Sequence, residues 1–181
     1  SRDNIGQSLV MLGEHAKIND LNQKNILNPL KLKPKKNRNI PFYFPNWFLN
    51  KRLIKIFNFL YYFLYKNSSK EKIVYWDDYF YPLDSIMGWN KIYGRKGFVQ
   101  YQCVIPLEKS KEGLIELLKE IDKSKVSSFL SVLKRFGKQN SKFSFPMEGY
   151  TIALDFPINK ETFKLLDKLD EITLKYKGRF Y

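Results

Sequence analysis

The sequence predicts an α+β fold, an antiparallel sheet with helices on one face and a ferredoxin-like β-α-β-β-α-β core. The first observation is that apolar residues after position 97 recur with a period of two in some segments and of about 3.6 in others. The second is their order along the chain, which is strand, helix, strand, strand, helix, strand. In this split βαβ arrangement two helices cover one sheet face, and the other face is free to meet a further layer.

Each element of this core has its own signal. Strands are predicted at 98–105, 127–134, 149–156 and 179–181, and helices at 109–124 and 160–176. Gly178 favours the end of the second helix just before the last strand. Because alternate strand residues point to opposite faces, one row of the first strand should face the helices. That row is Val99, Tyr101, Cys103 and Ile105.

Residues 41–66 are dominated by aromatic and aliphatic side chains, and we predict a helix over 42–65. Lys51, Arg52 and Lys55 interrupt the apolar run, which therefore falls short of the roughly 20 residues that span a bilayer. Two interpretations are open. The helix packs onto the sheet, or its aromatic and basic residues lie at the surface of an anionic membrane.

The first part of the chain shows little periodicity. Residues 1–24 are mixed polar and are interpreted as a connector, so the main domain is predicted to span 25–181. Within it, residues 31–39 form a basic run with one proline. Such a run neither builds a core face nor favours a long helix, and we expect a mobile loop at 30–40.

Composition limits the function classes. The 181 residues are 44% hydrophobic and 17% aromatic, which is enough for one sizeable core. The net charge of +14 suits an anionic partner, whether nucleic acid, a membrane surface or a phosphorylated substrate. A single cysteine, Cys103, excludes an intramolecular disulfide and a cysteine-based metal site, and it fits a reducing, cytoplasmic compartment.

Two glutamines on one face of an otherwise apolar strand are the most informative site signal. Gln100 and Gln102 lie two residues apart and should point to the face opposite Tyr101. An unpartnered buried amide costs roughly 2 kcal/mol. The pair therefore indicates either a bound polar ligand or an internal hydrogen-bond network, and we favour the ligand.

Several motifs accompany the glutamine strand in a fixed order. They are the segments 80–84 (FYPLD), 89–94 (WNKIYG), 97–106 (GFVQYQCVIP), 133–137 (LKRFG), 144–146 (SFP) and 154–157 (LDFP). Their order and spacing resemble FAD-linked oxidases related to decaprenylphosphoryl-ribose oxidase, over nearly the whole chain from about residue 13. The resemblance implies a substrate-binding domain of a larger flavoprotein of the vanillyl-alcohol-oxidase-like superfamily.

The resemblance also implies the site residues. In similar oxidases the glutamines corresponding to Gln100 and Gln102 line the pocket in front of the flavin. Lys134 matches a lysine that reaches that pocket, although a lysine at a strand end is ordinarily just exposed. Phe80 stands where mycobacterial members carry a pocket tyrosine, so a hydroxyl contact would come from a neighbour, either Tyr79 or Tyr81. The candidate substrate-binding set is Gln100, Gln102, Lys134, Phe80 and Tyr81, and no catalytic role is assigned.

The cofactor, partners and location follow from the same resemblance. FAD would be bound mainly by a flavin domain of the same polypeptide, to which residues 1–24 connect. The implied reaction is oxidation of a secondary alcohol of a sugar, such as a polyprenyl-phosphate-linked ribose, by hydride transfer to the flavin. This segment alone is expected to be inactive. A lipid-linked substrate would favour a peripheral position at the inner face of the membrane.

Other functional readings have less support. His15 is the only histidine and has no neighbouring nucleophile, so it is interpreted as structural. Ala153 stands where some mycobacterial members have a pocket cysteine, and chemistry that needs that thiol is absent. The alternative function is a basic ferredoxin-like RNA-binding module, since such sheets stack bases on aromatic residues. The aromatic motif of those modules is missing, and no nucleic-acid partner is expected.

Overall fold

The computed structural model describes residues 12–31, 37–45, 48–66, 71–81, 84–124, 126–139 and 145–181. The chain divides into two compact units. The first unit comprises Ser1–Pro41 and Lys55–Trp89, and the second comprises Phe42–Ile54 and Asn90–Tyr181. The boundary at residue 24 between connector and domain stays a prediction.

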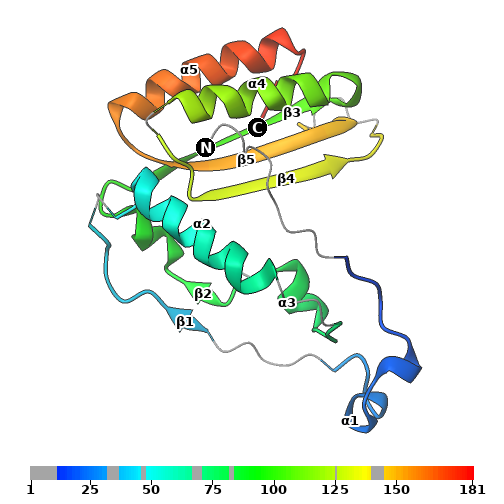
Figure 1. Cartoon of the computed structure of the whole chain (residues 1–181). Coiled ribbons are helices and arrows are strands. Elements are labelled where there is room, and N and C mark those ends of the chain that lie inside the picture. Colours follow the sequence, from blue (N-terminus) through cyan, green and yellow to red (C-terminus); the bar gives the residue numbers. More distant parts are fainter. Residues whose placement is uncertain are drawn as a thin grey trace. The chain divides into compact units, whose positions relative to one another are not determined.

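The second unit is built on a four-stranded sheet (Figure 1). Its strands are β3 (Phe98–Pro106), β4 (Leu130–Phe136), β5 (Gly149–Pro157) and β6 (Arg179–Phe180), and its long helices are α4 (Ser110–Lys123) and α5 (Lys160–Lys175). The strand order is β4-β5-β3-β6, and every neighbouring pair is antiparallel. The predicted α+β class and the β-α-β-β-α-β order are therefore confirmed.

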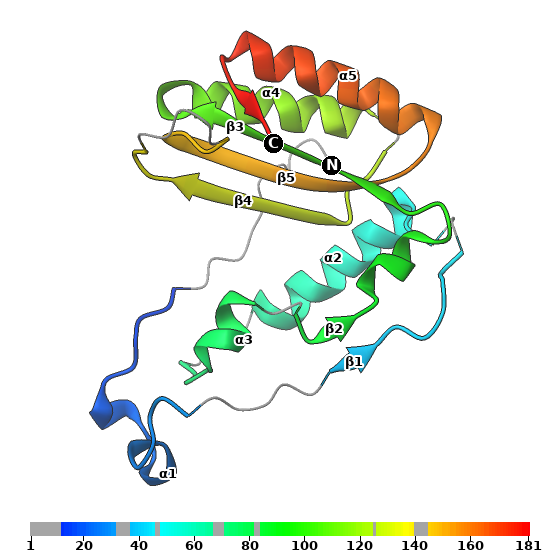
Figure 2. The same ribbon diagram turned by 180° about the vertical axis from the view of Figure 1, so that it is seen from behind.

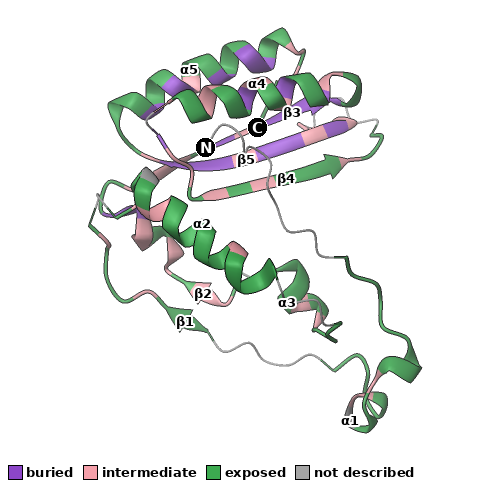
Figure 3. Ribbon diagram, in the orientation of Figure 1, coloured by how far each residue is buried: buried purple, intermediate pink, exposed green. Residues whose placement is uncertain are grey.

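Both long helices lie on the same side of this sheet, as the two opposite views agree (Figures 1 and 2). Leu117 of α4 and Leu169 of α5 are fully buried and belong to one apolar core with Phe156 of β5. The predicted inward row of β3 joins this core, with Cys103 and Ile105 fully buried. Figure 3 shows the buried residues concentrated along the central strands and on stripes of the two helices.

The ends of α5 are set by local hydrogen bonds. At the start, the Asn159 side chain accepts a hydrogen bond from the Thr162 backbone N–H at 2.8 Å, which is an ordinary N-cap. The helix ends before Gly178, as predicted, but Lys177 adopts the left-handed backbone conformation, with φ of 56°. Gly178 is required for another reason, because a Cβ there would lie 2.7 Å from the carbonyl oxygen of Val104.

Two predicted boundaries are wrong. The helix predicted from residue 42 is α2, which begins only at Lys51 and ends at Lys66. Asn50 delays it, since its side chain accepts hydrogen bonds from the backbone N–H groups of Arg52 and Leu53 and so forms the cap. The strand predicted at 127–134 is β4, which begins later because the Ser128 hydroxyl donates to the Leu130 carbonyl at 2.7 Å.

The first unit contains short elements and most of α2. Its helices α1 (Gln23–Ile26) and α3 (Trp76–Phe80) are short, and β1 (Arg38–Asn39) pairs in parallel with β2 (Ile86–Met87). Within the loop predicted at 30–40, the structure places β1, whose partner strand follows much later in the chain. Residues 32–36 lie outside the described ranges, and the mobile loop stays a prediction. Among the helices that the structure describes, none is both long and apolar enough to cross a bilayer.

The buried stripe of α5 allows a direct test of the core. Leu169→Ala should lower the free energy of unfolding by about 2–5 kcal/mol, because it removes a fully buried side chain and leaves a cavity. Leu174→Ala on the same helix is the matched control, since Leu174 is 63% exposed. Urea unfolding of both variants measures the difference, and equal losses would contradict the helix orientation.

Candidate functional site

The sheet face away from α4 and α5 carries the predicted glutamines and lysine. In the β3–β5 register Gln100 pairs with Asp155 and Gln102 with Ala153, and in the β5–β4 register Thr151 pairs with Lys134. Directly paired residues of an antiparallel sheet point to the same face, so these side chains share one polar face. Lys134 is two strands away from the glutamines, about 10 Å across the sheet.

Each glutamine amide is held at its nitrogen. Gln100 Nε2 donates a hydrogen bond to Asp155 Oδ1 at 2.9 Å, and Gln102 Nε2 donates to Thr151 Oγ1 at 3.2 Å. The Thr151 hydroxyl in turn donates to the Cys103 carbonyl at 2.9 Å. The internal network considered for the glutamine pair therefore exists, but it uses only one end of each amide.

The partners fix which way each amide points. An ionised carboxylate can only accept, so Gln100 must turn its nitrogen toward Asp155. The Thr151 hydroxyl already donates its one proton to the Cys103 backbone carbonyl, so it can only accept a hydrogen bond from Gln102. Within the described ranges neither amide oxygen accepts a hydrogen bond, and both are available to a ligand. The two oxygens belong to residues about 7 Å apart along β3.

Asp155 is the buried anchor of this face. The residue is 1% exposed, and burial raises the pKa of its carboxyl above the ordinary value, although the neighbouring Gln100 amide and Tyr93 hydroxyl lower it. Tyr93 is also buried, and its pKa is raised first by burial and then by the negative charge of Asp155. Its ring stacks on Phe98 with centroids 4.7 Å apart. A carboxylate and a phenol are thus packed together beneath Gln100.

Lys134 lies in a different setting. Its side chain is exposed, and Phe136 follows it two residues later on β4. Phe136 and Phe145 meet edge to face at 6.3 Å, and Phe145 meets Tyr181 at 5.4 Å. The Tyr181 backbone N–H donates to the Gln102 carbonyl, which continues the β6 pairing past Phe180. The lysine therefore presents its charge on the same sheet face as Phe136.

Phe80 and Tyr81 belong to the first unit, whereas the glutamines and Lys134 belong to the second. Phe80 ends α3 and is 59% exposed, with its ring edge to face against Tyr79 at 5.2 Å. The Tyr81 ring meets Trp76 at 6.1 Å and is 49% exposed. These two residues form a group of their own, and their place in a common site stays a prediction.

Sequence reasoning missed two residues of the polar face, Thr151 and Asp155, and the neighbouring Tyr93. A signal for two of them was present, because Thr151, Ala153 and Asp155 alternate along the strand predicted at 149–156. Their contacts with the glutamines could be known only from the register between β3 and β5. Tyr93 lies outside the sheet, in the turn of 3₁₀ helix Trp89–Tyr93, and no periodicity points to it.

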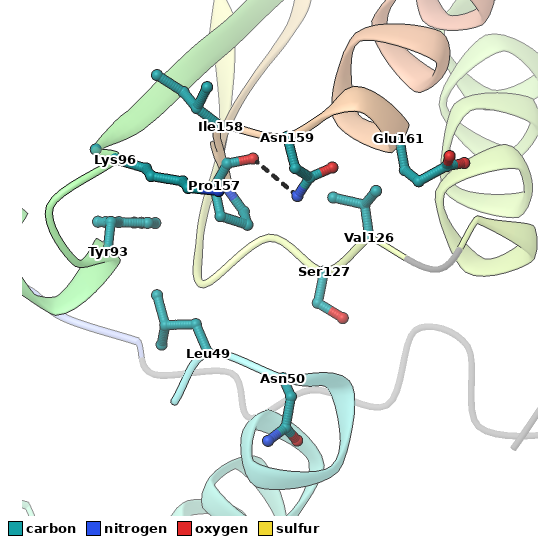
Figure 4. A pocket seen from close by; sticks show the side chains of 11 residues that line it. Leu49, Asn50, Tyr93, Lys96, Val126, Ser127, Pro157, Ile158, Asn159 and Glu161 are labelled. Atoms are coloured by element: carbon teal, nitrogen blue, oxygen red, sulfur yellow. Dashed lines mark hydrogen bonds between the residues drawn. The ribbon is translucent and has the colours of Figure 1, made fainter. Parts of the chain in front are cut away.

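A pocket of about 390 Å³ lies within the second unit, at the end of the sheet where β3 begins and β5 ends (Figure 4). Several of its polar side chains already serve the fold. Asn159 caps α5 and Asn50 caps α2, while Glu161 pairs with Lys164 at 3.2 Å. Tyr93 also lines this pocket. We therefore assign the pocket a structural role and place the candidate site on the polar face.

The class of protein is now defined as an α+β domain with a ferredoxin-like sheet, helices on one face and a polar, acceptor-lined second face. Comparison with curated proteins gives a relative that is more specific than this class. The chain is 33% identical over 178 residues to decaprenylphosphoryl-β-D-ribose oxidase of Mycolicibacterium smegmatis. The match covers 98% of this chain and 38% of that oxidase, so the chain spans about two fifths of the relative. No protein-family model matches the chain.

This similarity confirms the resemblance stated from the motifs. The chain is homologous to a part of an oxidase of that kind, and the part includes every segment on which the resemblance rests from residue 80 to residue 157. The homology supports an oxidoreductase domain as the broad assignment.

The buried carboxyl predicts how stability depends on pH. Because the folded pKa of Asp155 is raised, its contribution is fully present below the unfolded pKa and is lost as the pH rises through the folded pKa. Asp155→Asn should therefore be at least as stable as the wild type at pH 7, and the wild type should gain on the variant as the pH falls. Urea unfolding between pH 3 and pH 7 measures this, and a variant clearly less stable at pH 7 would contradict it.

Proposed function

We propose that this chain is the substrate-binding part of an FAD-dependent oxidoreductase that oxidises a secondary alcohol of a sugar. The observation that carries the proposal is the relation to an oxidase over 98% of the chain. That relative's name specifies a decaprenylphosphoryl ribose, so the proposed substrate class is a polyprenyl-phosphate-linked ribose. Since the chain spans only 38% of the relative, the activity is assigned to a longer polypeptide, and this segment alone is proposed to be inactive.

The polar face supports a role in holding a sugar. Gln100 and Gln102 each offer an amide oxygen to a hydroxyl, and each amide is fixed by a partner beneath it. Because the two amide oxygens are fixed in direction, they restrict the orientation of a bound alcohol. A restricted orientation favours reaction, since the alcohol is already aligned with the group that reacts with it. Lys134 adds a cation that can donate to a sugar oxygen or to a phosphate. The general base is assigned to none of these residues.

FAD, bound mainly by the flavin domain of the same polypeptide, would accept the hydride. The second unit is consistent with such an arrangement, because α4 and α5 cover only one side of its sheet. The exposed glutamine and lysine on the other side can then contribute to a site completed by another domain. Phe80 and Tyr81 are proposed as further substrate contacts from the first unit.

We also propose that the protein works at the inner face of an anionic membrane, where a lipid-linked substrate resides. In the first unit, α2 exposes large apolar side chains, with Phe59 at 67%, Phe63 at 64% and Leu64 at 72%. Aromatic and aliphatic side chains of this kind insert into the interface, and basic residues add about 1 kcal/mol each near anionic lipid. The net charge of +14 supplies the complementary sign.

The proposed site is tested by turnover of the longer, FAD-loaded polypeptide on polyprenylphosphoryl ribose. Gln102→Ala should lower kcat/KM about tenfold by removing one substrate hydrogen bond, and Lys134→Ala about 10- to 100-fold by removing a charged one, while FAD stays bound. Arg135→Ala is the matched control, since Arg135 is exposed and points to the opposite sheet face. Unchanged turnover in both site variants would remove these assignments.

The membrane proposal is tested with vesicles. Binding of the chain to vesicles rich in anionic phospholipid should be readily measured by co-sedimentation and should weaken at high salt. Replacing Phe59 and Phe63 by serine should reduce binding at least severalfold, because their buried area on the membrane is lost. Replacing Phe163 by serine is the control, since this exposed aromatic residue lies on α5. Equal binding by all three proteins would exclude α2 as the contact.

A further inference from the structure

Asp155 is a charged residue of the polar face that the proposed function leaves without a role. Its Oδ1 accepts the Gln100 amide, and its Oδ2, also buried, has no hydrogen-bond partner among the described residues. A carboxylate removed from water is destabilising unless its oxygens are well hydrogen-bonded. Asparagine would fit the same space without the charge. A group that is costly to the fold at such a position indicates a functional requirement.

The Gln100 side chain indicates what this requirement is, because its orientation depends on a partner that can only accept hydrogen bonds. Its exposed amide could turn over freely if its inner partner could both donate and accept, as an asparagine or a water molecule can. An ionised carboxylate removes that freedom, because it accepts only. Gln100 is therefore held with its nitrogen inward and its oxygen outward.

We propose that Asp155 is a positioning residue, which fixes the Gln100 amide so that the site accepts a hydrogen bond from a ligand hydroxyl at that point. This inference rests on the proposed function and extends it by assigning a polarity to the site. A ligand hydroxyl that donates to Gln100 is bound, whereas a carbonyl or ether oxygen in the same place meets a second acceptor and is disfavoured. The face thus selects the alcohol over the corresponding ketone at Gln100.

The groups around Asp155 determine how the orientation of the Gln100 amide depends on pH. The groups that face it are Gln100 from β3, Tyr93 from the 3₁₀ helix and, across the strand pair, Leu130 from β4. Tyr93 stays protonated near neutral pH because its pKa is raised. When Asp155 binds a proton it becomes a donor, and Gln100 can then turn its oxygen inward. At low pH the Gln100 amide is therefore no longer held with its oxygen toward the ligand.

The first experiment observes the amide directly and needs no turnover. In the ¹⁵N-labelled chain, the Gln100 side-chain NH₂ signals, assigned with Gln100→Ala, should shift as the pH is lowered through the titration of Asp155. In Asp155→Asn this shift should disappear. The Gln102 signals are an internal control, because their partner is the Thr151 hydroxyl. A Gln100 amide that does not titrate in the folded wild type would overturn the proposal.

The second experiment is a double-mutant cycle in the longer, FAD-loaded polypeptide, with polyprenylphosphoryl ribose as the probe. Asp155→Asn should raise KM about five- to tenfold, the effect of one misdirected hydrogen bond. In a Gln100→Ala background it should have little further effect, since Asp155 acts through Gln100. Asp167→Asn, an exposed carboxylate on α5, should leave KM unchanged.

The outcomes separate the two proposals. Additive effects of the two substitutions would overturn the positioning role, because Asp155 would then act independently of Gln100. If the wild-type polypeptide does not oxidise the sugar, the proposed function fails, and the titration of the Gln100 amide alone decides the positioning role. Thermal unfolding of Asp155→Asn, expected at a midpoint no lower than that of the wild type at pH 7, shows that a raised KM does not come from unfolding.

Discussion

The antiparallel pairing of β3 with β5 is the constraint on which the rest of the second unit depends. It runs through nine residue pairs, from Phe98 with Pro157 to Pro106 with Gly149. Because side chains alternate, a slip of one residue would carry Gln100 into the core and Cys103 to the other face. Gly149 protects this register, since a Cβ there would collide with the Ile105 carbonyl. The core and the polar face are therefore two consequences of one alignment.

Much of the fold could be predicted because its core follows simple periods. The order of strands and helices after residue 97 and the inward row of β3 were both correct. The errors at the starts of α2 and β4 have one physical cause, the competition of Asn50 and Ser128 side chains for backbone groups. The β1 pairing could not be predicted, since two residues have no period and their partner, Ile86–Met87, is distant in sequence.

Less of the candidate site than of the fold could be predicted from the sequence. Alternation alone placed Gln100 and Gln102 on one face, and it placed Lys134 correctly on its strand. It could not show that each amide is held at its nitrogen, because that depends on which β5 residue lies opposite. The Asp155 carboxylate, directly opposite Gln100, holds one amide, and the Thr151 hydroxyl, diagonal to Gln102 across the strand pair, holds the other. Protonation can therefore reverse the orientation of only one of these two amides, that of Gln100.

The position of Lys134 has a consequence for how the protein behaves at high concentration. β4 forms an outer strand of the four-stranded sheet, so its outward backbone groups can pair with a strand from another molecule. Lys134 and Arg135 stand next to each other on this strand, both exposed, and two such strands brought together would repel through four cations. Lysine at this point thus protects the sheet from self-association, whatever it binds. A neutral substitution there would weaken a barrier to aggregation as well as remove a charge.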